Sequence, residues 1–297
     1  MTVDEQYSYD VLMQDIAALQ ERYTQFMRVE TLGYSVLGRE IPLLILGNDN
    51  ATKQVWVDGS IHGREYMTSQ VVMMQVAWLL QISEEAGTFV WPNVQYHIVP
   101  MLNPDGVELS RFGLSSVDDL QKREELLAIN GGSEDFTRYK ANANGVDLNS
   151  NFPAYWEEKD TGVYAPAPEG FKGYAPLSQP ETQAVARYIQ RRLDASVSYH
   201  AVGAEIYWYF YQTGDRLERD RAVAIAVGNI TDYRLMPEQD SLSGAGLRDY
   251  QILDFQRIGL TIEIGPTTTP APPPLSDLDV IWQRNRDVLL RLPLYIP

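Results

Sequence analysis

The chain has 297 residues, of which 44% are hydrophobic and 22% charged, and this balance is typical of a globular protein and not of a disordered one. Its 40 acidic residues exceed the 24 Lys and Arg, giving a formal charge of −16, so we expect no nucleic-acid partner. No cysteine is present, which excludes disulfides and thiolate metal sites and leaves His, Asp and Glu as metal ligands.

The N-terminal sequence MTVDEQYSYD is acidic and lacks the pattern of a secretory signal. The longest apolar stretch, at residues 71–82, is shorter than the roughly 20 residues that a bilayer requires. We therefore expect a cytoplasmic protein with no membrane span and no obligate protein partner.

Short β-branched runs alternate with amphipathic runs along the chain, which predicts an α/β fold with a mixed, largely parallel sheet flanked by helices. We expect one domain over residues 1–297, with an N-terminal helix and lead-in over 1–40 and a motif-bearing part over about 41–291. Strands are predicted at residues 41–46, 54–60, 94–101, 196–200, 205–211 and 259–264. Helices are predicted within 11–26 and at 68–82, 217–229 and 278–290, and another should begin at a Ser178–Glu181 capping box with Pro180 in its first turn.

Each of the three histidines has a different place in this pattern. His62 follows the predicted strand VWVDGS and Glu65 comes three residues later, at the carboxyl edge of the sheet, where α/β proteins build their sites. His200 ends the strand SVSYH and should reach the same edge. Two imidazoles and one carboxylate leave a fourth position for water, as in hydrolytic zinc sites. His97 lies inside VQYHIVP and is predicted to be a hydrogen-bonded core residue.

Glu263 is a carboxylate inside the apolar strand LTIEIG. Because burying an unpaired carboxylate is costly, such a residue is either ion-paired or functional. The functional interpretation makes Glu263 the base that a hydrolytic zinc site needs.

Six motifs in chain order resemble the zinc carboxypeptidases of the carboxypeptidase A type. They are DGSIHGREY, MLNPDG, GVDLNSNFP, SYH, SGAGLRDY and TIEIG, within residues 50–265. The blocks YKANANGVDLNSNFPAYWEEK, GAEIYW and IWQRN are further similar to a bacterial branch, the γ-D-glutamyl-meso-diaminopimelate peptidases, which cut the stem peptide of peptidoglycan.

The resemblance implies a zinc carboxypeptidase-like fold and one Zn²⁺ per chain. It implies that His62, Glu65 and His200 bind the metal and that Glu263 activates the attacking water. Asp147 of GVDLN would orient the His62 imidazole.

Other positions bear on the substrate. The resemblance implies that Arg64 meets a substrate carboxylate or carbonyl and that Asn149 holds the group beyond the scissile bond. Ser150 stands where the family carries the arginine that clamps a C-terminal carboxylate. Asn144 replaces an arginine of the diaminopimelate branch, and Arg138 or Lys140 is a candidate substitute for it near the reacting oxygen.

Arg248 of SGAGLRDY corresponds to the family position at the floor of the side-chain pocket. A guanidinium there would favour an anionic group, such as a carboxylate of diaminopimelate. The alternative is that Arg248 pairs with a neighbouring acid.

We therefore predict a zinc-dependent peptidase that hydrolyses γ-D-glutamyl-diaminopimelate or similar bonds in small peptides or muropeptides from peptidoglycan. Two alternatives stay open. One is a zinc amidohydrolase that removes an acyl group from an acidic amino acid, and the other is an inactive homologue that binds zinc and peptide.

Overall fold

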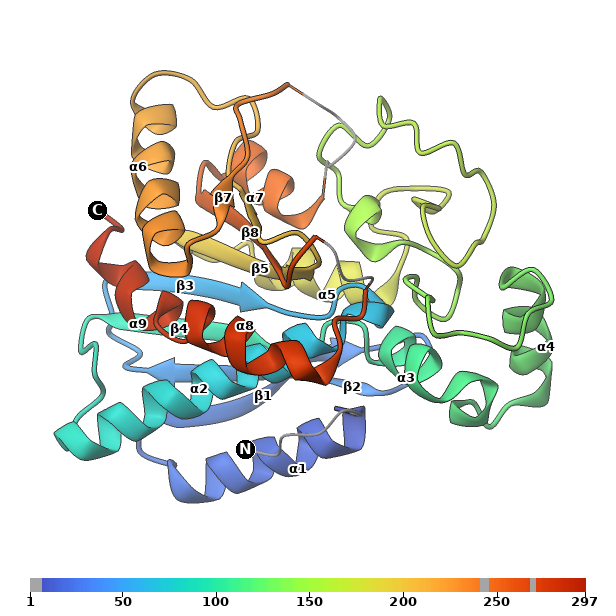
Figure 1. Cartoon of the computed structure of the whole chain (residues 1–297), viewed down its shortest axis with the longest axis horizontal. Coiled ribbons are helices and arrows are strands. Elements are labelled where there is room, and N and C mark those ends of the chain that lie inside the picture. The colour runs from blue at the N-terminus through green and yellow to red at the C-terminus, as the bar shows by residue number, and fades with distance from the viewer. Residues whose placement is uncertain (1–6, 241–245, 268–270) are drawn as a thin grey trace.

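The computed structural model describes residues 7–240, 246–267 and 271–297, and these contain one eight-stranded sheet in the order β1-β2-β4-β3-β5-β8-β6-β7 (Figure 1). The strands are β1 Met27–Tyr34, β2 Glu40–Gly47, β3 Lys53–Asp58, β4 Val94–Val99, β5 Ala195–Ala201, β6 Glu205–Tyr207, β7 Arg234–Leu235 and β8 Ile258–Ile264. The central strands β4, β3, β5 and β8 are parallel, whereas β1, β2 and β6 pair antiparallel with their neighbours in the β1–β2, β2–β4 and β6–β8 pairs. The predicted mixed, largely parallel sheet is confirmed.

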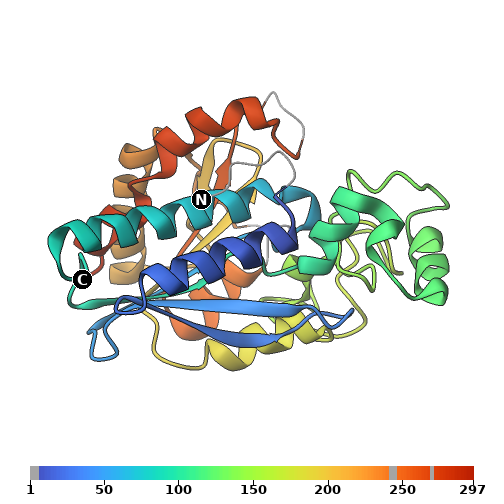
Figure 2. The same ribbon diagram turned by 90° about the horizontal axis from the view of Figure 1, so that it is seen from below.

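Helices cover both faces of the sheet. They are α1 Tyr9–Arg22, α2 Met67–Ala86, α3 Pro104–Phe112, α4 Leu120–Ile129, α5 Pro180–Tyr188, α6 Gly214–Thr231, α7 Leu247–Phe255, α8 Leu278–Asn285 and α9 Val288–Arg291. Figure 2 shows α1 and α2 on one side of β1 and β2 and α5 on the other. None of the helices in the described ranges has both the length and the apolar character needed to cross a bilayer.

Strand β2 shows how the sequence builds the two layers. Successive side chains of a strand point to opposite faces. Leu44 and Leu46 accordingly pack in the core under α1, α2, α6 and α8, while Leu43 and Ile45 pack in the core under α5 and α7. Because both faces are covered, the strand reads as a continuous apolar run and not as an alternating one.

Several elements differ from those expected from the sequence. Strands β1 and β7 and helices α3, α4 and α7 were not predicted. The strand predicted over 205–211 ends at Tyr207, where its pairing with β8 also ends, and the left-handed backbone of Tyr211 (φ 58°) excludes a strand that reaches 211. The helix predicted over 278–290 is divided into α8 and α9.

The predicted capping box at Ser178 is wrong. Helix α5 begins after Gln179, whose side chain makes no capping bond, although Pro180 does lie in the first turn. The Ser178 hydroxyl instead accepts a hydrogen bond from Asn151 Nδ2 at 3.0 Å. Ser178 therefore stabilises the loop before the helix.

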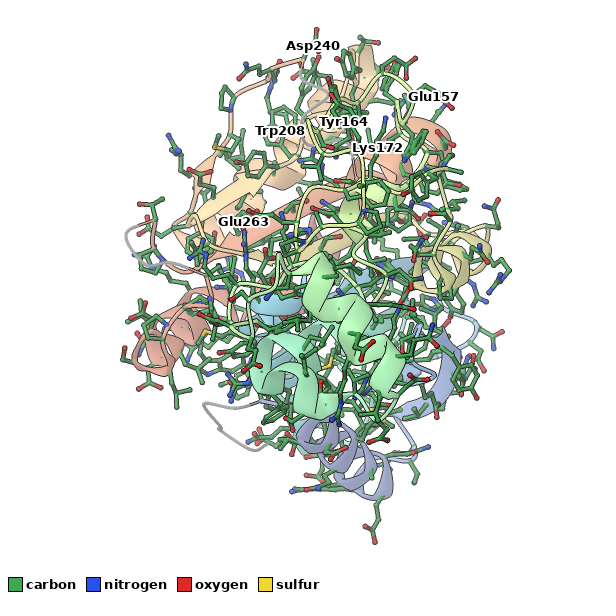
Figure 3. All side chains as sticks on the ribbon, turned by 90° about the vertical axis from the view of Figure 1, so that its right-hand side faces the viewer. Glu157, Tyr164, Lys172, Trp208, Asp240 and Glu263 are labelled. Atoms are coloured by element: carbon green, nitrogen blue, oxygen red, sulfur yellow. The ribbon has the colours of Figure 1, made fainter. Side chains whose placement is uncertain are left out.

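The carboxyl ends of the parallel strands β3, β5 and β8 lie together at one end of the molecule. Helices α3 and α4 and the loops that precede α5 gather at that end in both Figure 1 and Figure 2. Figure 3 looks onto it and labels Glu263 together with Tyr164 and Lys172 of the loop before α5. The loops between β4 and β5 therefore enclose the edge of the sheet at which the sequence predicts a site.

Candidate metal centre

The turn after β3 carries two of the predicted ligands. His62 precedes the short helix η1 (Gly63–Glu65), which places Glu65 one turn further on. The turn is held from below, because Ser60 N donates to Thr68 Oγ1 at 2.7 Å and the Ser60 and Ser69 hydroxyls lie 2.7 Å apart. The first turn of α2 thereby fixes the loop that presents the ligands.

Helix α3 supports the same turn from the side. Asn103 caps this helix by accepting from Gly106 N at 2.9 Å, and its Nδ2 donates to Ile61 O at 3.2 Å. A Cβ on Gly63 would lie 2.3 Å from Gly106 O, so the two backbones meet too closely for any larger residue. The MLNPDG motif is thus part of the support of the ligand turn.

His62, Glu65 and His200 converge as predicted. The two Nδ1 atoms lie 3.2 Å apart, and Glu65 lies 2.9 Å from His62 Nδ1 and 3.2 Å from His200 Nδ1. All three residues are buried, and among the described residues they form the one group of three or more His, Asp and Glu able to hold a metal ion.

The spacing of this donor set fits zinc. Two nitrogen ligands about 2.0–2.1 Å from a tetrahedral zinc ion lie roughly 3.4 Å from each other. Burial alone would raise the pKa of Glu65, but the two imidazoles outweigh it and hold that pKa well below its usual value. Glu65 therefore presents a carboxylate to the ligand position.

Asp147 lies behind His62, on the side away from Glu65. Its Oδ1 is 3.3 Å from His62 Nε2, and Lys140 Nζ is 3.7 Å from its other oxygen. Burial alone would raise the pKa of Asp147, but the charges of Lys140 and His62 outweigh burial and hold that pKa well below its usual value. An ionised Asp147 favours the proton on Nε2 and leaves the Nδ1 lone pair of His62 for a metal.

Glu263 faces His200 across the β5–β8 pair. Burial, opposed by His200 and reinforced by Glu65, raises the pKa of Glu263 to about 7. A carboxyl group that exchanges its proton near neutral pH is suited to general acid and base chemistry.

A pocket of about 520 Å³ opens beside these groups and is lined by His62, His200 and Glu263. Its other walls carry Lys140, Asp147, Asn149, Ser150, Lys159, Asp160, Thr161, Gly170, Tyr207, Arg248 and Thr261. The volume is that of a small-molecule or short-peptide site.

Two predicted substrate residues reach this pocket. Arg248 is buried, and its Nε donates to Asp249 Oδ1 at 2.6 Å, which is the pairing that the sequence left as the alternative. Asn149 Oδ1 accepts from Leu247 N at 3.0 Å and so anchors the start of α7.

Arg64 and Arg138 are not among the pocket-lining residues in the described ranges. The Arg64 guanidinium donates to Glu169 Oε2 at 2.8 Å and to the Arg138 carbonyl at 3.2 Å. Arg138 itself is exposed, whereas Lys140 lines the pocket. Of the two basic residues considered near the reacting oxygen, Lys140 is the one that the structure brings to the site.

Sequence reasoning missed Lys159 as a pocket residue, whereas Tyr207, which also lines the pocket, belongs to the block GAEIYW. Lys159 is the last residue of the block YKANANGVDLNSNFPAYWEEK, and this resemblance is the one sequence signal that pointed to it. Of the SGAGLRDY block, Ser243, Gly244 and Ala245 lie outside the described residues.

His97 is a core residue, as predicted. Its ring nitrogens lie 2.8 Å from the Tyr188 hydroxyl and 2.5 Å from Gln54 Oε1. Burial lowers the pKa of His97 to about 4, so the imidazole is neutral at pH 7.

Residues 12–287 match the sequence model of the zinc carboxypeptidase family. The chain is 35% identical to the gamma-D-glutamyl-L-diamino acid endopeptidase 1 of Lysinibacillus sphaericus, over 96% of the chain and 71% of that protein. It is 32% identical to the uncharacterized protein YqgT of Bacillus subtilis (strain 168), over 83% of the chain and 67% of that protein.

Solved structures agree on the fold. The carboxypeptidase A of Helicoverpa armigera superimposes with a TM-score of 0.72 at 18% identity, covering 97% of this chain and 72% of that one. The murein-tripeptide amidase MpaA of Escherichia coli O157 superimposes with a TM-score of 0.54 at 23% identity, covering 89% of this chain and 91% of that one. At these identities the likeness concerns the fold alone.

Proposed function

Because the chain belongs to the zinc carboxypeptidase family, we propose that it hydrolyses the bond between γ-D-glutamate and a diamino acid in peptides derived from peptidoglycan. The observation that carries the proposal is the convergence of His62, Glu65 and His200 beside Glu263, in a chain similar along 96% of its length to an endopeptidase named for that bond. We propose that the whole chain acts as one peptidase domain.

One zinc ion per chain would be held by His62 Nδ1, His200 Nδ1 and the Glu65 carboxylate. When bound, zinc lowers the pKa of a water molecule toward 7 and polarises a carbonyl oxygen. Asp147 keeps the His62 ring in the tautomer and orientation that this role needs.

Glu263 moves the proton. Its partly buried carboxylate takes a proton from the attacking water and then delivers it to the nitrogen of the leaving amine. Burial raises the pKa of this carboxyl group above its usual value, which makes Glu263 a better proton acceptor than an ordinary surface glutamate.

Two cationic side chains would favour an acidic peptide. Lys140, beside Asp147, is placed to stabilise negative charge on the reacting oxygen. Arg248 would bind a carboxylate of the leaving residue while Asp249 holds its guanidinium in place. Arg64 and Arg138 keep the substrate contacts predicted from the sequence only if they move toward the pocket when substrate binds.

The direct test is hydrolysis of L-Ala-γ-D-Glu-meso-diaminopimelate by the zinc-loaded protein, followed by mass spectrometry. Glu263→Gln serves as the inactive control and a hippuryl C-terminal peptide as the comparison substrate. Release of diaminopimelate by the native protein alone supports the proposal.

Other results would favour the two alternatives. Hydrolysis of acylated acidic amino acids, without cleavage of either peptide, would indicate an amidohydrolase. Zinc binding without any hydrolysis would indicate an inactive peptide-binding homologue. The cytoplasmic location stays a prediction from the sequence, which cell fractionation would test.

A further inference from the structure

We propose that Glu169 is a specificity-determining residue, whose carboxylate holds Arg64 in the free protein and is replaced there by the α-carboxylate of the γ-D-glutamyl residue of the substrate. This inference rests on the proposed function and names the group that the substrate displaces. Glu169 belongs neither to the ligand set nor to the substrate contacts predicted from the sequence.

Arg64 comes one residue before the metal ligand Glu65, and its side chain is only 15% exposed. Its Nη1 donates to Glu169 Oε2 at 2.8 Å and to the carbonyl of Arg138 at 3.2 Å. Its Nε is buried and has no hydrogen-bond partner among the described residues. The guanidinium is therefore oriented by two acceptors but still has a donor to offer, as bidentate binding of a carboxylate requires.

The two members of this ion pair differ in exposure. The Glu169 side chain is 59% exposed, against 15% for Arg64. An ion pair with an exposed carboxylate contributes little to stability, because water solvates that carboxylate almost as well. A largely buried guanidinium, in contrast, needs an acceptor. The pair is thus suited to exchange one carboxylate for another.

Backbone hydrogen bonds join three chain segments around the pair. Gly63 N donates to the carbonyl of Lys140 at 3.0 Å, and Lys140 N donates to that of Pro168 at 2.9 Å. Gly170, the residue after Glu169, lines the pocket, as Lys140 does. The ion pair therefore lies beside the pocket on a fixed backbone, and the exchange requires movement of side chains alone.

The segment that holds Arg64 identifies the substrate group. Lys140 is assigned to the reacting oxygen, and its carbonyl binds the turn that carries Arg64. Arg248, which is assigned to the leaving residue, lies instead in α7. A γ-linked D-glutamyl residue has a free α-carboxylate on the carbonyl side of the scissile bond. That carboxylate is the group we place on Arg64.

The exchange has a consequence for selectivity. A substrate carboxylate receives charge-assisted hydrogen bonds from Arg64, whereas a neutral carboxamide at the same position competes poorly with the charged Glu169. We therefore expect the free acid to be preferred over its amide. Because the acid must displace Glu169 first, this residue also limits the affinity for the acid.

The test compares L-Ala-γ-D-Glu-meso-diaminopimelate with the same peptide in which the glutamyl α-carboxylate is a carboxamide. For the native protein we expect a higher kcat/KM for the free acid. In Glu169→Gln this preference should increase by about 2- to 5-fold, the range of an exposed ion pair. The increase should come from a lower KM for the acid, with little change for the amide.

Two further comparisons separate displacement from other effects. Arg64→Gln should bring the preference toward one, and adding Glu169→Gln to that variant should not change it further. Glu157→Gln removes another exposed acid at the same end of the molecule (Figure 3) and should leave the preference unchanged. Zinc content and thermal unfolding of each variant report whether the fold is intact.

An unchanged or lower preference in Glu169→Gln would overturn the assignment and leave the proposed function standing. An equal increase in Glu157→Gln, or an increase that persists without Arg64, would do the same. Failure of the native protein to cleave either peptide would overturn the proposed function, and the assignment with it.

Discussion

His97 and His200 are buried in strands that both pair with β3, yet their surroundings differ. His97 lies within β4 and has a neutral hydrogen-bond partner at each ring nitrogen. His200 lies near the carboxyl end of β5, where its Nδ1 meets Glu65 and His62. Position along the strand therefore decides whether a buried imidazole serves the core or the site, and the variants below test that division.

The largest effect is expected at the edge of the sheet. Glu263→Gln keeps the size of the side chain but cannot accept the proton, so kcat should fall by roughly 10²- to 10⁴-fold. Steady-state kinetics measure the loss, and atomic absorption should show unchanged zinc content. Activity within a few-fold of the native protein would remove Glu263 from the mechanism.

The interior histidine should affect stability in a pH-dependent way. The pKa of His97 is about 4 in the folded protein, against about 6.5 in the unfolded chain, so the unfolded chain binds more protons as pH falls. The resulting loss of stability begins below pH 6.5, is complete near pH 4 and amounts to about 3 kcal/mol.

In His97→Gln this part of the pH dependence should disappear. Urea unfolding at pH 7, 5.5 and 4 should show a smaller decrease for the variant than for the native protein. Peptidase activity at pH 7 should be retained, because His97 does not line the pocket. If the free energy of unfolding fell equally with pH in the two proteins, the assignment of His97 as a buried neutral imidazole would be contradicted.

A smaller effect is expected where the metal ligand meets its supporting group. Asp147→Asn removes the charge that orients His62 and should weaken zinc binding by about 10- to 100-fold. Competition with a chelator measures the affinity. Asp160→Asn, an exposed acid at the pocket mouth, is the matched control and should bind zinc as the native protein does.

The ligand set could be predicted from the sequence because each ligand lies at, or within a few residues after, the carboxyl end of a strand. His62 and His200 each follow or end an apolar run, and parallel strands bring their carboxyl ends to one edge. Glu263 stands out as a carboxylate in an apolar strand. Each of these signals is local in the sequence, and the pairing of the parallel strands brings the residues close together in space.

The cations of the pocket could not be placed in the same way. Lys140, Lys159 and the exposed Arg138 all lie in a segment without periodic hydrophobicity, where chain position says little about direction. Helix α4 was missed for a related reason, since Leu126 is its one fully buried residue. Strand β1 was missed because it is an edge strand whose residues are mostly half-buried or exposed.

X-ray absorption at the zinc edge tests the central claim most directly, with zinc content measured on the same samples. We predict one zinc per chain with two nitrogen ligands at about 2.0–2.1 Å. His200→Gln should lose one imidazole from this shell and most of the metal, and His97→Gln should lose neither. A third imidazole in the native spectrum, or full zinc content in His200→Gln, would contradict a site built from His62, Glu65 and His200.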